Sequence, residues 1–170
     1  MTFLEHTEYN LKCKMCAKFV VLATTGIIFR GNSHHSDRIF KIQKRMIRII
    51  TNTGRQDSCH QLYKQLQILP LPSQYIFSLL AFVNKNRGLF LSNSEIHDIN
   101  TRYNYNVHLP STNLTLEQKG VLYSESRIYN HLPLNNKILL NDAKHFKSTL
   151  RSYLIEHMLY SLDEYYQLRS

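Results

Sequence analysis

Cysteine, glycine and tryptophan are scarce in this chain, which has three, five and none of them in 170 residues. Three cysteines are too few for a disulfide framework, so we expect an intracellular location, nuclear or cytoplasmic. The glycines are scattered, which excludes a glycine-rich phosphate loop. Apolar runs such as Phe19 to Ala23 are far too short to span a bilayer, and we expect no membrane partner.

The residues that catalysis would need are also missing. Phosphoryl transfer with two Mg²⁺ ions uses paired carboxylates to hold the metal, and the sequence contains no Asp-Asp pair. The nine histidines show no Ser or Cys nucleophile at a recognisable spacing. Cys13 and Cys16 have the spacing of half a zinc site, but Cys59 is the one remaining cysteine. We therefore predict no catalytic residue, no metal and no cofactor.

Positive charge is what the chain has in excess. It has 21 Lys and Arg against 12 Asp and Glu, for a net charge of +9. That balance favours anionic partners, with nucleic acid first and an acidic membrane surface second. Hydrophobic residues make up 43% of the chain, which is enough for a folded domain with a core.

The rest of the chain is organised around the stretch from Ser36 to Asn52, which has a helical period. Ser36 is the expected N-cap, and Asn52 with Gly54 is the expected stop. Apolar residues share one side that can bury: Ile39, Phe40, Ile42, Met46, Ile47, Ile49 and Ile50. Cations share the other: Arg38, Lys41, Lys44, Arg45 and Arg48, with Arg55 beyond the turn. Such a face suits a phosphate backbone, although a basic face that is simply solvated is the alternative.

Further helices are expected along the chain, at about 59–67, 74–86, 115–132, 143–159 and 161–166. The expected N-caps are Asp57 or Ser58, Ser73, Asn141 or Asp142, and Ser161. The stretch from Thr24 to Phe29 predicts a short strand or helix, and 10–22 a further helix. Leu91 to Asn113 is polar and predicts a long loop, with a short extended piece at Asn106–Leu109. The fold class is therefore a mostly α-helical bundle of about five helices, with an extension over 1–25 and a single domain over 26–170.

Several segments, in this order, resemble the C-terminal region of reverse transcriptases from jockey-type non-LTR retrotransposons. They are GIIFRGNS (Gly26–Ser33), RIFKIQKRMIRIITNTGRQDSC (Arg38–Cys59), LYKQLQILPLPSQYIFSLLAFVNKN (Leu62–Asn86), TRYNYNVHLP (Thr101–Pro110), LTLEQKGVLYSESRIYNHLP (Leu114–Pro133) and KHFKSTLRSYLIEHMLYSLDEYY (Lys144–Tyr166). In that family the region follows the polymerase palm and runs from the thumb to the C-terminus. The family usually has an aromatic residue where this chain has Arg30.

The resemblance implies a non-catalytic C-terminal fragment of an RNA-directed DNA polymerase. It implies sequence-independent binding of RNA or an RNA–DNA hybrid through the basic helix, and an intact polymerase subunit as a further partner. Lys144, Lys147 and Arg151 repeat the basic spacing on the last long helix, where a solvated face is the favoured interpretation. Two alternatives remain: a helical protein-interaction module whose basic face docks an acidic partner, and a pseudogene product without a selected function.

Overall fold

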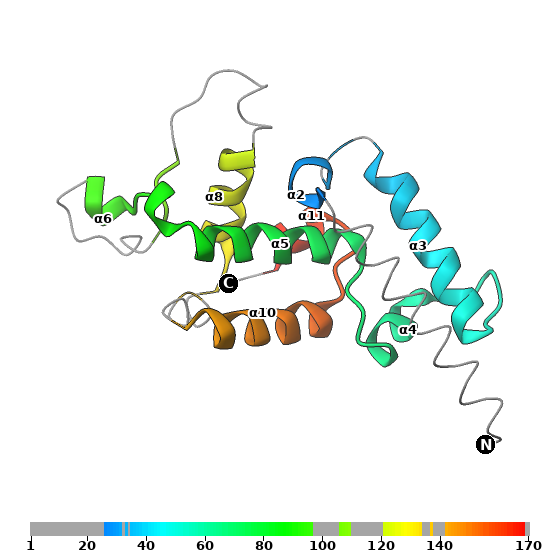
Figure 1. Ribbon diagram of the computed structural model, residues 1–170. Helices are drawn as coiled ribbons and strands as arrows, with labels where there is room; N and C mark the ends of the chain where they lie inside the picture. The colour runs from blue at the N-terminus through cyan, green and yellow to red at the C-terminus, as the bar shows by residue number, and fades with distance from the viewer. Residues whose placement is uncertain are drawn as a thin grey trace. The chain divides into compact units, whose positions relative to one another are not determined.

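A computed structural model describes residues 26–31, 33, 35–96, 106–109, 121–133, 137 and 142–168 (Figure 1). Of these residues 71% are helical and none forms a strand, and five helices have seven residues or more. The prediction of a mostly α-helical bundle of about five helices is therefore confirmed. None of the helices in these ranges is long and apolar enough to cross a bilayer.

The helices are α2 (Ile27–Arg30), α3 (Ser36–Thr51), α4 (Cys59–Gln65), α5 (Leu71–Lys85), the 3-10 turn η1 (Arg87–Leu89), α6 (Asn93–Ile96), α8 (Val121–His131), α10 (Ala143–His157) and α11 (Leu162–Gln167). Those with a predicted counterpart follow the predicted order. The short helix α6 lies inside Leu91–Asn113, where the sequence predicts a loop, so that prediction is wrong at Asn93–Ile96. The helix predicted from 115 is described only from Val121. The helix predicted over 10–22 lies outside the described residues.

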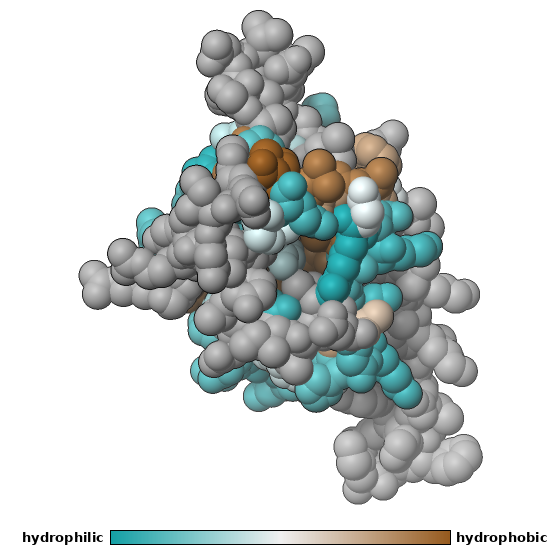
Figure 2. All heavy atoms as spheres, turned by 90° about the vertical axis from the view of Figure 1, so that its left-hand side faces the viewer, coloured by the Kyte–Doolittle hydropathy of each residue, from teal (hydrophilic) through white to brown (hydrophobic). Residues whose placement is uncertain are grey.

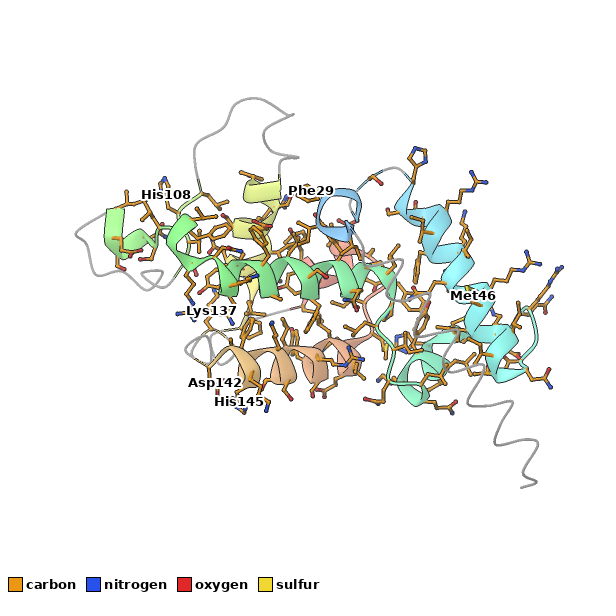
Figure 3. All side chains as sticks on the ribbon, viewed as in Figure 1. Phe29, Met46, His108, Lys137, Asp142 and His145 are labelled. Atoms are coloured by element: carbon orange, nitrogen blue, oxygen red, sulfur yellow. The ribbon has the colours of Figure 1, made fainter. Side chains whose placement is uncertain are left out.

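Three helix ends behave as the sequence predicts. Asn52 ends α3 in the left-handed conformation, with φ of 54°, which asparagine tolerates better than most residues. Ser58 caps α4 by accepting a hydrogen bond from the His60 amide. Asp142 caps α10, because its Oδ1 accepts from the amides of Lys144 and His145 at 3.0 and 3.1 Å. Asp142 and His145 are labelled at the start of that helix in Figure 3.

Two predicted caps are wrong. Ser36 is the first helical residue rather than the N-cap, and its hydroxyl donates to the carbonyl of Ser33 at 2.7 Å. Ser73 lies inside α5, which begins at Leu71, and its buried hydroxyl donates to the carbonyl of Leu159 at 3.0 Å. Pro72 does not delay the start of α5, because an amide in the first helical turn needs no intrahelical partner.

The chain is divided into two compact units, and the boundaries fall inside α5, α10 and α11. The first unit comprises residues 1–75 and 154–162 and contains α2, α3 and α4. Within it α3 packs beside α4. Gly31 lies where an added Cβ would meet the ring of Tyr75, so this end of α2 requires a glycine. The buried apolar side chains of this unit include Phe40, Ile47, Tyr63, Leu69, Leu154 and Met158.

The second unit comprises residues 76–153 and 163–170. Its buried side chains include Ile76, Leu79, Leu80, Ile128, Phe146, Leu150 and Tyr165. The Tyr165 hydroxyl donates to the carbonyl of Ile128 at 2.9 Å, which joins α11 to α8. Part of the predicted extended piece is present as an isolated antiparallel bridge between Ser92 and Val107. The amide of Asn130 holds it by pairing with both backbone groups of Val107 at 2.8 Å.

Candidate nucleic-acid interface

The inner side of α3 fixes the helix to its own unit. Phe40, Gln43 and Ile47 are buried there. The side-chain amide of Gln43 donates to the carbonyl of Leu69 at 3.1 Å and accepts from the amide of Leu71 at 2.9 Å. Leu71 opens α5, so Gln43 satisfies one of the amides that a helix start leaves without an intrahelical partner. The rotation of α3 about its own axis is therefore set by a buried polar contact as well as by apolar packing.

Three cations point away from that anchored side. Arg38, Lys41 and Arg45 are exposed, and in the part of the chain that the structure describes they have no hydrogen-bond or ion-pair partner. We call these three residues the basic ridge. Side chains with nitrogen ends project outward from α3 in Figure 3. The ridge is thus a row of charges on a fixed helix that have no partner among the described residues, so an anionic surface can reach them without breaking a contact within those residues.

Two other predicted cations on α3 are partly committed to the fold. The Lys44 ammonium lies 4.4 Å from the ring centroid of Phe40 and 5.4 Å from that of Tyr160. Arg48 donates from Nε and Nη2 to the carbonyl of Asp57, at 3.1 and 3.0 Å. The bonds of Arg48 hold the turn between α3 and α4, and Lys44 packs against the rings of Phe40 and Tyr160. Lys44 and Arg48 are therefore supporting residues, whose loss would disturb structure as well as charge.

Arg55, the sixth predicted site residue, is exposed in the turn between α3 and α4. The turn is closed by Asp57, whose Oδ2 accepts from the amide of Gly54 at 2.7 Å. Six of the 21 Lys and Arg lie between Arg38 and Gln56, a stretch without Asp or Glu. The structure thus divides the six predicted residues into four that are exposed and two that stabilise the fold.

The apolar side of α3 is only partly buried. Phe40 and Ile47 belong to the core. Ile39, Ile42 and Ile49, in contrast, retain 36%, 46% and 63% of their accessible surface. The sequence predicts a side that can bury, and these three residues of that side stay exposed in the structure. Periodicity predicts which residues share a side, but the width that neighbouring elements cover depends on tertiary packing.

The second basic set lies on α10. Lys144, Lys147 and Arg151 are all exposed. The apolar positions of the same helix, Phe146, Leu150 and Leu154, are each 0% exposed. The apolar side of α10 is therefore buried and its charged side faces solvent, as the solvated-face interpretation predicts.

In the described ranges no group of three or more His, Cys, Asp or Glu could hold a metal ion. Cys59 is a free, buried thiol whose Sγ donates to the carbonyl of Lys44 at 3.7 Å. Cys13 and Cys16 lie outside the described residues. Among the histidines, the ring of His60 packs against that of Tyr160 at a centroid distance of 5.5 Å. Cys59 and His60 thus have structural contacts.

A small pocket of about 240 Å³ lies in the second unit. Its lining residues are Val83, Arg87, Phe90, Ser92, Glu95, Val107 and Tyr129. The Glu95 carboxylate already has hydrogen-bond partners within the chain, because it accepts from the amide and hydroxyl of Ser92 at 2.6 and 2.7 Å. These bonds lower its pKa. A pocket of this size falls below the usual range for small-molecule sites.

Exposed hydrophobic side chains also occur in the second unit, at Leu89, Leu91 and Ile96. Figure 2 views the side on which α6 lies in Figure 1 and shows brown hydrophobic spheres among teal hydrophilic ones. These residues come from η1, α6 and the segment between them. Unlike the isoleucines of α3, they do not form a stripe along one long helix.

The sequence analysis does not single out two ionisable groups of the second unit, the buried Glu125 and the half-buried Lys137. Glu125 on α8 is 0% exposed, and among the residues that the structure describes neither of its carboxylate oxygens has a hydrogen-bond partner. Burial raises its pKa to about 7. Burial also lowers the pKa of Lys137 to about 8, although its ammonium donates to Asn106 Oδ1 and to the carbonyl of Asn130 at 2.9 and 2.8 Å. A serine-rich helix with one glutamate gives no signal in sequence that the glutamate faces inward.

Comparison of the chain with protein-family models, with curated proteins and with solved structures finds no match.

Proposed function

We propose that the chain is a non-catalytic C-terminal fragment of a non-LTR retrotransposon RNA-directed DNA polymerase that binds RNA or an RNA–DNA hybrid through α3. The observation that carries the proposal is the basic ridge, three exposed cations without a partner in the described part of the chain, on a helix whose opposite side is anchored by Gln43. The ordered resemblance of the sequence segments to the thumb-to-C-terminal region of that family supports it.

The mode of binding follows from the chemistry of the ridge. Arginine and lysine ends reach phosphate oxygens, and contacts of this kind position a duplex without reading its bases. Arg55 adds a fourth exposed cation beyond the helix end. Each cation that neutralises a phosphate releases condensed counterions, so the affinity should fall steeply with salt and vary little with sequence. We expect no polymerase activity from this chain alone.

The test is fluorescence-anisotropy titration of a short RNA–DNA hybrid across a salt series. The wild-type chain is compared with a ridge variant, Arg38→Gln, Lys41→Gln and Arg45→Gln. Lys44 and Arg48 are left intact because they stabilise the fold. A matched control changes three exposed lysines elsewhere, Lys85→Gln, Lys144→Gln and Lys147→Gln, with the same loss of charge.

We expect the ridge variant to lower the slope of log affinity against log salt by about 2 to 3, because about three phosphate contacts are lost. The control should keep most of the wild-type slope. Equal slopes in the two variants would show that net charge, and not α3, governs binding. A folded wild-type chain that does not bind the hybrid at low salt would refute the proposed function.

A further inference from the structure

The exposed isoleucines of α3 form an ordered stripe. Ile39, Ile42, Met46 and Ile49 follow one another at intervals of three, four and three residues. Ile39, Ile42 and Ile49 are exposed and Met46 is half-buried; Met46 is labelled on α3 in Figure 3. We call these four residues the apolar seam. At 100° per residue the seam covers an arc of about 80°. A stripe this narrow, at this spacing, is typical of helix–helix pairing rather than of a helix that faces a broad core.

The seam lies between two other sectors of the same helix. On one edge lies the buried side with Gln43 and the half-buried Ile50, which already packs within its own unit. On the other edge Arg38 and Arg45 each precede a seam residue, at the positions that flank the apolar stripe in a heptad pattern. A partner that covers the seam must therefore place its own flanking residues beside two arginines.

We propose that the apolar seam docks an amphipathic helix of another protein whose apolar stripe is flanked by carboxylates. Charge complementarity selects this occupant, because Arg38 and Arg45 favour Asp or Glu on the partner's edge and disfavour Lys or Arg. This inference goes beyond the proposed function and does not rest on it.

The charges of α3 disfavour a second copy of the chain at this surface. Two α3 helices placed seam to seam would bring together ten cations, five from each, and offer only Asp37 from each helix as a counter-charge. The geometry disfavours a bilayer, since a helix in the interface buries a wide apolar face. Here the seam is narrow, and the adjoining apolar residues Phe40 and Ile47 are already buried.

The experiment uses the full chain and a defined probe. The probe is a fluorescein-labelled, covalently stapled three-heptad helix with Leu and Ile in its stripe and Glu on both flanks. A second peptide has the same stripe with Lys on the flanks. The wild-type chain should bind the Glu-flanked peptide at least about tenfold more tightly than the Lys-flanked peptide.

Two variants separate the seam from its charged edge. Ile42→Gln with Ile49→Gln should weaken binding of the Glu-flanked peptide by about tenfold or more, because both side chains leave water in the complex. Both residues are exposed, so melts followed by circular dichroism should match the wild type. Arg38→Glu with Arg45→Glu should reverse the preference toward the Lys-flanked peptide.

Equal affinity for the two peptides, or unchanged binding by the seam variant, would overturn the inference. Binding of the chain to vesicles of phosphatidylcholine with phosphatidylserine is measured as a third comparison. Binding to vesicles that is lost in the seam variant, without binding to either peptide, would overturn it in favour of a lipid surface. Because the seam variant retains Arg38, Lys41 and Arg45, its binding to an RNA–DNA hybrid should be unchanged, which keeps this test separate from that of the proposed function.

Discussion

Helices α3 and α10 carry the same basic spacing but leave different surfaces free. Arg38, Lys41 and Arg45 on α3 match Lys144, Lys147 and Arg151 on α10 in exposure and sign. On α10 the apolar residues Phe146, Leu150 and Leu154 are fully buried. On α3 a second apolar stripe, the seam, lies outside the core beside the cations.

This difference identifies α3 as the stronger candidate for a contact surface. A basic face is the ordinary outer side of an amphipathic helix, and α10 fits that description completely. On α3 the cations lie beside apolar surface that folding leaves in water, which has an unfavourable hydration free energy. Because α3 leaves both its cations and its apolar seam exposed, it is the better candidate for binding a partner. The sequence pattern of the cations alone does not distinguish α3 from α10.

The largest expected effect concerns the apolar residues of the two helices. Leu150→Ala on α10 should lower the free energy of unfolding by about 2–5 kcal/mol, because it leaves a cavity in a filled core. Ile49→Ala on α3, at 63% exposure, should change it by about 0.5 kcal/mol or less. Urea unfolding followed by circular dichroism measures both. Similar losses from both substitutions would mean that the seam is covered in the folded chain.

The next effect concerns the anchor of α3. Gln43→Ala should cost about 2–3 kcal/mol, because the amide of Leu71 and the carbonyl of Leu69 are left buried without a partner. The control is Gln61→Ala on α4, which is exposed and should be nearly neutral. The same urea titration gives both values. If Gln43→Ala unfolds at the wild-type midpoint, the buried amide does not fix α3.

Most of the helical fold could be predicted from the sequence, because its signals are local. The period of α3, the left-handed stop at Asn52 and the cap at Asp142 depend on neighbours in the chain. Serine favours the N-cap role, which predicts Ser73 as a cap, but its hydroxyl donates to the carbonyl of Leu159, which is distant in sequence. The capping of α5 by Gln43 could not be predicted for the same reason.

The residues of the candidate site could be predicted from the sequence, but not which of them are exposed and which stabilise the fold. The six cations were found from spacing and sign. Their division into exposed and supporting residues depends on Tyr160 and on the carbonyl of Asp57, which the spacing does not reveal. The exposure of Ile39 and Ile42 depends likewise on how much of α3 its unit covers.

A smaller effect compares the buried carboxyl group of Glu125 with the exposed cations. The pKa of Glu125 is about 7 in the folded chain, above the value of about 4.3 expected for an unfolded glutamate. The folded state therefore holds a proton that the unfolded chain has released, so stability falls as the pH rises from about 4.5 to about 7. Glu125→Gln should remove this pH dependence and raise stability at pH 8 by about 1–3 kcal/mol. Urea unfolding at pH 5 and pH 8 checks it.

The control substitution neutralises an exposed cation and is measured in the same assay. Lys41→Gln should leave the dependence of stability on pH unchanged, since its side chain is exposed. A Glu125→Gln variant that keeps the wild-type pH profile would show that another group titrates in this range.

The comparison of α3 with α10 is tested most directly by lysine footprinting of the unmodified chain. The chain is acetylated briefly at low salt, with and without a short RNA–DNA hybrid, and the modification of each lysine is measured by mass spectrometry. We predict that the hybrid protects Lys41 strongly and leaves Lys144 and Lys147 as reactive as in the free chain. Protection of Lys144 and Lys147 with an unprotected Lys41 would contradict the proposal that α3 is the nucleic-acid interface.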